Sequence, residues 1–97
     1  MRREEALRLL TEASPEIVRQ FGVKGLRLFG STARDEARED SDVDVLVEFE
    51  GPATFDGYFT LLHFLEARLG VNVDLVTEKG LKERVRPYVE KDAIHVA

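Results

Sequence analysis

Apolar residues recur at helical spacing in several separate segments of the chain. Between Arg3 and Glu12 they repeat every few positions, as on the buried face of an amphipathic helix. Ser14-Pro15 has the form of an N-cap followed by proline at the first helical position, so we expect a helix to start or restart there. Further helices are expected over residues 32–37, with Ser31 as N-cap, over 54–69 and 81–86, and from Pro87 to about Lys91.

Other segments alternate between apolar and polar residues, which is typical of strands with one buried face. In the second of them, Val43, Val45, Val47 and Phe49 would share that face. The predicted strands cover residues 24–29, 42–49, 71–76 and 93–96. This order of elements predicts a single α+β (mixed α/β) domain over residues 1–97, with a mixed sheet of three to four strands and helices packed mainly on one face.

The segment 54–69 carries more apolar residues than one narrow stripe of a helix can hold. Most of them are expected in the core. The alternative is that part of this helix meets another protein, or a second copy of the chain, and so forms an interface of a homo- or hetero-oligomer.

Composition narrows the class of protein. The 97 residues carry a net charge of −5, which disfavours a nucleic-acid partner because phosphate contacts need a basic surface. The absence of cysteine excludes disulfides and thiolate metal sites. No stretch approaches the roughly 18 apolar residues of a membrane span, so we expect no membrane association and a cytoplasmic location.

Two aspartates interrupt the apolar pattern at the start of the second predicted strand. Asp42 and Asp44 are two positions apart, so both side chains would leave the same face, where like charges repel. A divalent cation would remove that repulsion. Carboxylates without histidine or cysteine suit Mg²⁺, or alternatively Mn²⁺.

A third carboxylate fits the same site. In the strand predicted over 71–76, Asp74 lies on the face opposite to Val73 and Leu75. If this strand is the neighbour of the Asp42 strand, the three aspartates Asp42, Asp44 and Asp74 could hold two metal ions for phosphoryl or nucleotidyl transfer.

A phosphate-binding turn is predicted just before the aspartates. Gly30 would let the backbone approach a phosphate closely, and Ser31 would add a hydroxyl donor at the start of the next helix. Arg34 could reach back with its guanidinium, although an ion pair with a nearby carboxylate is an equal alternative. Taken singly, a Gly-Ser turn and an Asp-x-Asp strand end are more often structural, and the joint pattern carries the prediction.

The joint pattern GSTAR…SDVDVLV, followed by a lone Asp74, resembles the signature of DNA polymerase β-like nucleotidyltransferases. More narrowly, residues 26–96 resemble the minimal nucleotidyltransferases (MNT). These are stand-alone catalytic domains of prokaryotes found beside helical HEPN-domain proteins. The chain departs from the family pattern at Asp35, where many members have glycine, and at Val45, where many have leucine.

The resemblance implies the nucleotidyltransferase fold and Mg²⁺-dependent transfer of AMP from ATP to a tyrosine of a HEPN-domain toxin, which the chain would silence as its antitoxin. Gly30 and Ser31 would hold the triphosphate, with Arg34 as a further phosphate contact. Asp42 and Asp44 would bind both metal ions. Asp74 would complete the catalytic metal site and help to deprotonate the acceptor.

Two other functions remain compatible with the sequence. The chain could neutralise its partner by stoichiometric binding alone, as the apolar segment 54–69 would allow. It could instead be a catalytic subunit that adenylylates a small molecule or an RNA end, of which the acidic composition disfavours the RNA.

Overall fold

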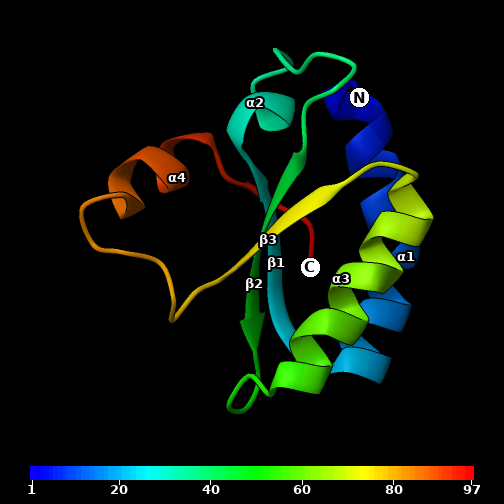
Figure 1. Ribbon diagram of the computed structural model, residues 1–97, viewed down its shortest axis with the longest axis vertical. Coiled ribbons are helices and arrows are strands. Elements are labelled where there is room, and N and C mark those ends of the chain that lie inside the picture. Colours follow the sequence, from blue (N-terminus) through cyan, green and yellow to red (C-terminus); the bar gives the residue numbers. More distant parts are fainter.

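The computed structural model describes all 97 residues, in which helices and strands alternate along the chain (Figure 1). The helices are α1 (Arg3–Phe21), α2 (Gly30–Ala33), α3 (Phe55–Leu69) and α4 (Arg86–Asp92). The strands are β1 (Val23–Phe29), β2 (Val43–Phe49), β3 (Val73–Thr77) and β4 (Ile94–His95).

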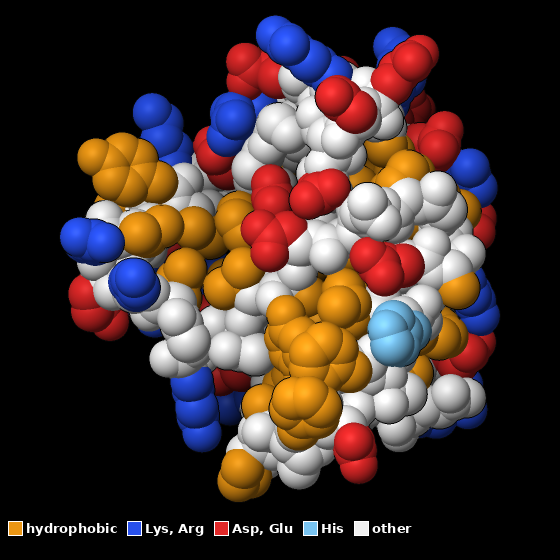
Figure 2. Space-filling model, in the orientation of Figure 1, with side chains coloured by type: hydrophobic (Ala, Val, Ile, Leu, Met, Phe, Trp, Pro, Cys, Tyr) orange, Lys and Arg blue, Asp and Glu red, His pale blue; other side chains and the backbone are white.

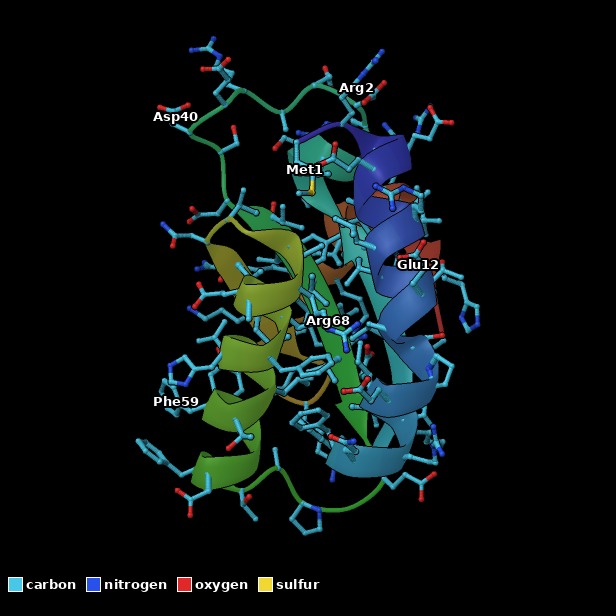
Figure 3. The ribbon with its side chains drawn as sticks, turned by 90° about the vertical axis from the view of Figure 1, so that its right-hand side faces the viewer. Met1, Arg2, Glu12, Asp40, Phe59 and Arg68 are labelled. Carbon is cyan, nitrogen blue, oxygen red and sulfur yellow. The ribbon has the colours of Figure 1, made fainter.

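The four strands form one mixed sheet in the order β3-β2-β1-β4. β1 pairs antiparallel with both β2 and β4, whereas β2 and β3 are parallel. α1 and α3 lie side by side against one face, and α4 lies on the other side of the sheet (Figures 1 and 3). This architecture confirms the predicted α+β class and the neighbouring positions of β2 and β3.

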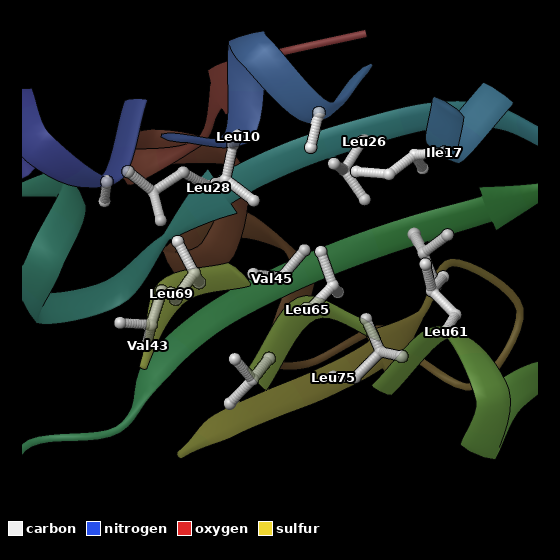
Figure 4. Close-up of a cluster of buried hydrophobic side chains, with 14 of the residues drawn as sticks. Leu10, Ile17, Leu26, Leu28, Val43, Val45, Leu61, Leu65, Leu69 and Leu75 are labelled. Carbon is white, nitrogen blue, oxygen red and sulfur yellow. The ribbon is translucent and has the colours of Figure 1, made fainter. Parts of the chain in front are cut away.

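The main core lies between the sheet and the two long helices (Figure 4). Leucines of α1 and α3 meet the inward residues of β1, β2 and β3, and Val43, Val45 and Val47 are fully buried, as the alternation predicts. A second, smaller cluster of Leu46, Leu81 and Val89 lies elsewhere. Leu46 alternates with the inward valines along β2, so this cluster attaches α4 to the opposite face of the sheet.

The helix start expected at Ser14-Pro15 is wrong, because α1 continues through Pro15 without a break. Proline has no N–H to donate to the carbonyl of Thr11, four residues earlier. The Ser14 hydroxyl donates to that carbonyl instead, at 2.9 Å. Ser14 therefore supplies a hydrogen bond that the proline removes, and it does not cap a new helix.

Several other boundaries differ from the prediction. The helix expected over 81–86 is absent: residues 81–85 form bends and turns, and α4 begins only at Arg86, with Pro87 in its first turn. Leu81 is buried beneath the sheet, so packing decides the course of this segment. The strands begin or end one or two residues away from the expected positions, and β2 starts at Val43, which leaves Asp42 just before it.

The apolar surplus of α3 is divided between core and surface. Leu61, Leu65 and Leu69 are buried, as expected for the inward stripe. Phe55 is 78% exposed and Phe59 38% exposed, with their ring centroids 4.7 Å apart. In Figure 3, Phe59 points away from the body of the protein. We call Phe55 and Phe59 the aromatic patch.

Candidate active site

Gly30 brings the end of β1 against a carboxylate of β2. Phe29 pairs with Asp44 across the antiparallel strands, and the chain then turns at Gly30 with a φ of +73°. A Cβ atom built on Gly30 would lie 2.0 Å from Oδ2 of Asp44. Only glycine tolerates both this φ and this close approach. The predicted turn and the predicted Asp-x-Asp segment are therefore in contact.

The sequence predicted Ser31 as the N-cap of the helix, but Ser31 lies inside the first turn of α2. The cap position belongs to Phe29, which makes no side-chain cap bond. The helix ends after Ala33, and the Glu36 amide closes the next turn by donating to the Ser31 carbonyl at 2.8 Å. Ser31 is half-buried and lies next to Gly30, within the same turn.

Asp44 and Asp74 stand directly opposite each other in the parallel β2–β3 register. Both alternate with buried core residues, so they leave the face of the sheet that α1 and α3 do not cover. Asp44 is half-buried and Asp74 is exposed. The expected juxtaposition of these two carboxylates is therefore present in the fold.

Asp42 is exposed and precedes the strand, so strand alternation does not fix its direction. No three acidic or histidine side chains of the chain are assembled into a metal-binding group. The structure therefore holds Asp44 and Asp74 together, and Asp42 lies beside them in the sequence without completing a preformed triad.

The electrostatics of the pair favour a cation. Burial and the Asp74 carboxylate raise the pKa of Asp44 to about 6, with a smaller contribution from Asp42. None of the ion pairs of the chain involves these three aspartates. An aspartate in the unfolded chain has a pKa near 3.9. Because the pKa of Asp44 is higher in the folded state, the free energy of unfolding falls as pH rises from about 4 to about 6 and the unfolded chain releases the proton more readily. Hard oxygen donors under mutual repulsion suit a divalent cation.

Arg34 takes part in the ion pairs that were the alternative to a phosphate contact. Its Nε lies 2.8 Å from Oε1 of Glu36, and its Nη1 lies 2.5 Å from Oδ2 of Asp92 in α4. Its charge still acts on the site, since it opposes the upward shift of the Asp44 pKa. Asp92 had no signal in the sequence, because its partner is 58 residues away.

Asp35, at the position where many family members have glycine, has a φ of +60°. This left-handed conformation explains why glycine suits the position. Aspartate is tolerated here for a visible reason: its Oδ1 accepts a hydrogen bond from the Arg3 backbone N–H at 2.9 Å. That bond caps α1, whose own N-cap residue Arg2 makes no side-chain bond.

Tyr58 of α3 reaches β3 next to Asp74. Its hydroxyl donates to the Leu75 carbonyl at 2.5 Å, next to Asp74 in the chain. Burial, and then the Asp74 charge, raise the pKa of Tyr58. The hydrogen bond to β3 gives Tyr58 a packing role between α3 and the sheet.

The charged and apolar surfaces meet on one face of the molecule. Figure 2 shows acidic side chains gathered near the starts of β2 and β3, with a hydrophobic area below them over α3. A separate shallow hollow lies at the other end of these strands, where it is lined by Val47, Phe49, Thr77 and their neighbours. None of the predicted site residues lines that hollow. The candidate site is therefore at the aspartates and the Gly30 turn.

Comparison with known proteins agrees with this geometry. The sequence profile of the nucleotidyltransferase domain matches residues 10–95. The chain belongs to this family. It is 41% identical over 93 residues to the protein adenylyltransferase MntA of Thermococcus cleftensis, covering 96% of this chain and 94% of that protein. A relative from Methanocaldococcus jannaschii is 41% identical over 80 residues, which cover 79% of this chain and 80% of that protein.

Solved structures place this nucleotidyltransferase in the minimal group. One structure of a minimal nucleotidyltransferase superposes with a TM-score of 0.81 at 46% identity, covering 97% of this chain and 95% of that chain. An MNT antitoxin structure, determined with the tri-AMPylated HEPN toxin of Shewanella oneidensis, superposes with a TM-score of 0.69 at 18% identity, covering 94% and 71%. This second likeness shows the shared fold. None of the helices has the length and apolar character needed to cross a membrane.

The cap formed by Asp35 can be tested by substitution. Asp35→Ala removes the bond to the Arg3 amide and keeps the left-handed strain, so we expect the free energy of unfolding to fall by about 1–2 kcal/mol. Asp35→Gly also loses the bond but relieves the strain, so its stability should lie closer to wild type. Urea unfolding at pH 7 measures both.

Asp40→Ala is the matched control, because Asp40 is exposed in the same loop and makes no side-chain hydrogen bond or ion pair. An equal loss of stability in the alanine and glycine variants of Asp35 would contradict the strain argument. An unchanged alanine variant would contradict the cap.

Proposed function

We propose that the chain is a Mg²⁺-dependent protein adenylyltransferase that transfers AMP from ATP to a tyrosine of a cognate HEPN-domain toxin. In this role it is the antitoxin of the pair and acts in the cytoplasm. The observation that carries the proposal is the contact between the Gly30 turn and Asp44, with Asp74 directly opposite. The kinship with MntA of Thermococcus cleftensis, named a protein adenylyltransferase, supports the choice of nucleotide and acceptor class.

The residues of the site have distinct roles in this proposal. Gly30 and Ser31 hold the triphosphate, because the close approach of Gly30 to Asp44 sets this turn beside the metal-binding carboxylates, and Ser31 adds a hydroxyl donor. Asp42, Asp44 and Asp74 would hold two Mg²⁺ ions, or Mn²⁺ in their place, which would supply positive charge to offset that of the triphosphate and to lower the pKa of the acceptor hydroxyl. Asp42 is exposed and can turn toward the pair when a cation is bound.

The transfer itself is a displacement at the α-phosphorus of ATP. The tyrosine Oη forms the new bond to phosphorus, the bond to the bridging oxygen of the β-phosphate breaks, and pyrophosphate leaves. The phenolic proton passes to Asp74, the exposed carboxylate of the pair, which an acceptor from outside can reach.

We further propose that residues 1–97 form one catalytic domain and that the acceptor tyrosine belongs to the HEPN-domain toxin. The aromatic patch is the proposed docking surface for the HEPN-domain toxin. Phe59 contacts Tyr58 at a centroid distance of 5.1 Å, and Tyr58 reaches β3 beside Asp74, so the patch is continuous with the acidic site. A partner seated on both would bury two exposed aromatic rings and bring its tyrosine to the aspartates.

Catalysis can be separated from stoichiometric binding. We expect the wild-type chain with Mg²⁺ and labelled ATP to label the co-purified HEPN-domain toxin, and Asp42→Asn to reduce the rate by at least about a hundredfold, because a metal ligand is lost. Replacement of the toxin's tyrosines by phenylalanine should abolish the label.

Retained neutralisation of the toxin in cells by an Asp42→Asn/Asp44→Asn variant that still binds it would favour the binding-only function. Labelling of RNA or a small molecule, with none on the toxin, would favour the other alternative. Lys79→Gln, a change of an exposed charge beside the hollow at the far end of the strands, is the matched control and should label at the wild-type rate.

Docking at the aromatic patch is tested by Phe55→Ser. The side chain is largely exposed, so we expect unchanged stability and ATP binding, but about tenfold weaker binding of the toxin, since a buried aromatic contact is lost. Titration calorimetry with the toxin measures the affinity.

Val18→Ser is the control for this variant, because Val18 is also a partly exposed apolar residue but lies on α1. Equal toxin affinity of the Phe55 variant and wild type would rule out the patch. A wild-type dimer that the Phe55 variant converts to a monomer would reassign the patch to self-association.

A further inference from the structure

α2 and α4 are joined by an ion pair between residues 58 positions apart in the sequence. Oδ2 of Asp92, the last residue of α4, lies 2.5 Å from Nη1 of Arg34, the residue that ends α2. The Asp92 side chain is only 17% exposed, against 63% for Glu36, the second carboxylate on the same guanidinium. Water therefore screens the attraction of Arg34 to Asp92 less than its attraction to Glu36.

The two carboxylates leave part of the guanidinium free. They bind Nε and Nη1, whereas Nη2 has no hydrogen-bond partner in the protein. Arginine offers five N–H donors in a fixed plane, so two anchored nitrogens determine the direction of the third. Arg34 follows directly on the turn that begins at Gly30, and its charge acts on Asp44, so its guanidinium lies near the site.

The location of Asp92 is otherwise unfavourable. A carboxylate in the last turn of a helix faces the negative end of the helix dipole. Asp92 lies at that end of α4, and only Arg34 forms an ion pair with it. α4 itself is attached to the sheet through Val89 in the Leu46 cluster, so Asp92 is held on a fixed support.

We propose that Asp92 is a positioning residue, which orients Arg34 so that its free Nη2 donates to the β- or γ-phosphate of the bound nucleoside triphosphate. The inference rests on the proposed function only in placing a triphosphate at the Gly30 turn. It assigns a function to α4: the helix couples the C-terminal segment of the chain to nucleotide binding. Without Asp92, Arg34 keeps its charge but loses its less exposed anchor. The guanidinium must then be ordered when the nucleotide binds, and the entropy lost in ordering it weakens binding.

The test measures binding of a non-hydrolysable ATP analogue with Mg²⁺ by titration calorimetry, and KM and kcat with ATP. We expect Asp92→Asn to weaken analogue binding and raise the KM for ATP about tenfold, with kcat nearly unchanged, since a charge-assisted contact is lost on binding. Asp92→Glu should recover part of the affinity. In Arg34→Ala, the further change Asp92→Asn should have no effect, because Asp92 acts only through Arg34.

Glu16→Gln is the matched control, since Glu16 forms a 2.8 Å ion pair with Arg68 between α1 and α3, the two helices on the face of the sheet opposite to Asp44 and Asp74. Its nucleotide binding should equal wild type. Wild-type or tighter binding by Asp92→Asn would overturn the inference, because Asp92 would then be neutral or a competitor for Arg34. A lower affinity of the double variant than of Arg34→Ala would also overturn it.

The outcomes separate this inference from the proposed function. Nucleotide binding without transfer to any protein would overturn the proposed transfer, and the analogue affinities of the Asp92 variants would still decide the role of Asp92. Failure of the wild type to bind the analogue would overturn both.

Discussion

The contact of Asp44 with the Gly30 turn is the constraint on which the rest of the site depends. The antiparallel β1–β2 pair sets Phe29 opposite Asp44, so the backbone at Gly30 runs directly beside the carboxylate. The parallel β2–β3 pair sets Asp74 on the other side. Two carboxylates are thus held together by backbone pairing, and neither forms an ion pair with a cationic side chain of the protein. The fold accepts this local repulsion, and a metal-bound triphosphate is the partner that would relieve it.

The short helix α2 has little stability of its own, because four residues cannot form a helix that persists alone. It is fixed by contacts at its end. Asp35 binds the first turn of α1 through the Arg3 amide, and Arg34 binds Asp92 at the end of α4. Both contacts join segments that are far apart in the sequence. The Gly30 turn is therefore supported from both sides of the sheet, and Asp35, in spite of its left-handed backbone, adds a cap to α1.

Most helices and strands could be predicted, because alternation and turn residues are local signals. The sequence also placed Asp44 and Asp74 together on the condition that their strands are neighbours, and the contact of Gly30 with Asp44 emerged only from the strand pairing. The continuous course of α1 through Pro15 could not be predicted. The Ser14 hydroxyl replaces the hydrogen bond that Pro15 cannot donate, and helix propensities do not include such a bond. The absence of a helix over 81–86 depends on the burial of Leu81 against Leu46, a tertiary contact. Asp92 and the left-handed Asp35 were equally hidden, because their partners lie more than 30 residues away.

Thermal unfolding of wild type and Asp44→Asn, with and without Mg²⁺ and a non-hydrolysable ATP analogue, tests the central claim most directly. Without ligand at pH 8, Asp44→Asn should melt above wild type, because the amide removes a charge that is costly above the raised pKa of about 6. The difference should shrink as pH falls toward 4. Mg²⁺ with the analogue should raise the melting temperature of wild type and leave Asp44→Asn nearly unchanged. A wild type that does not respond, or a ligand-free Asp44→Asn that melts below it, would contradict the account.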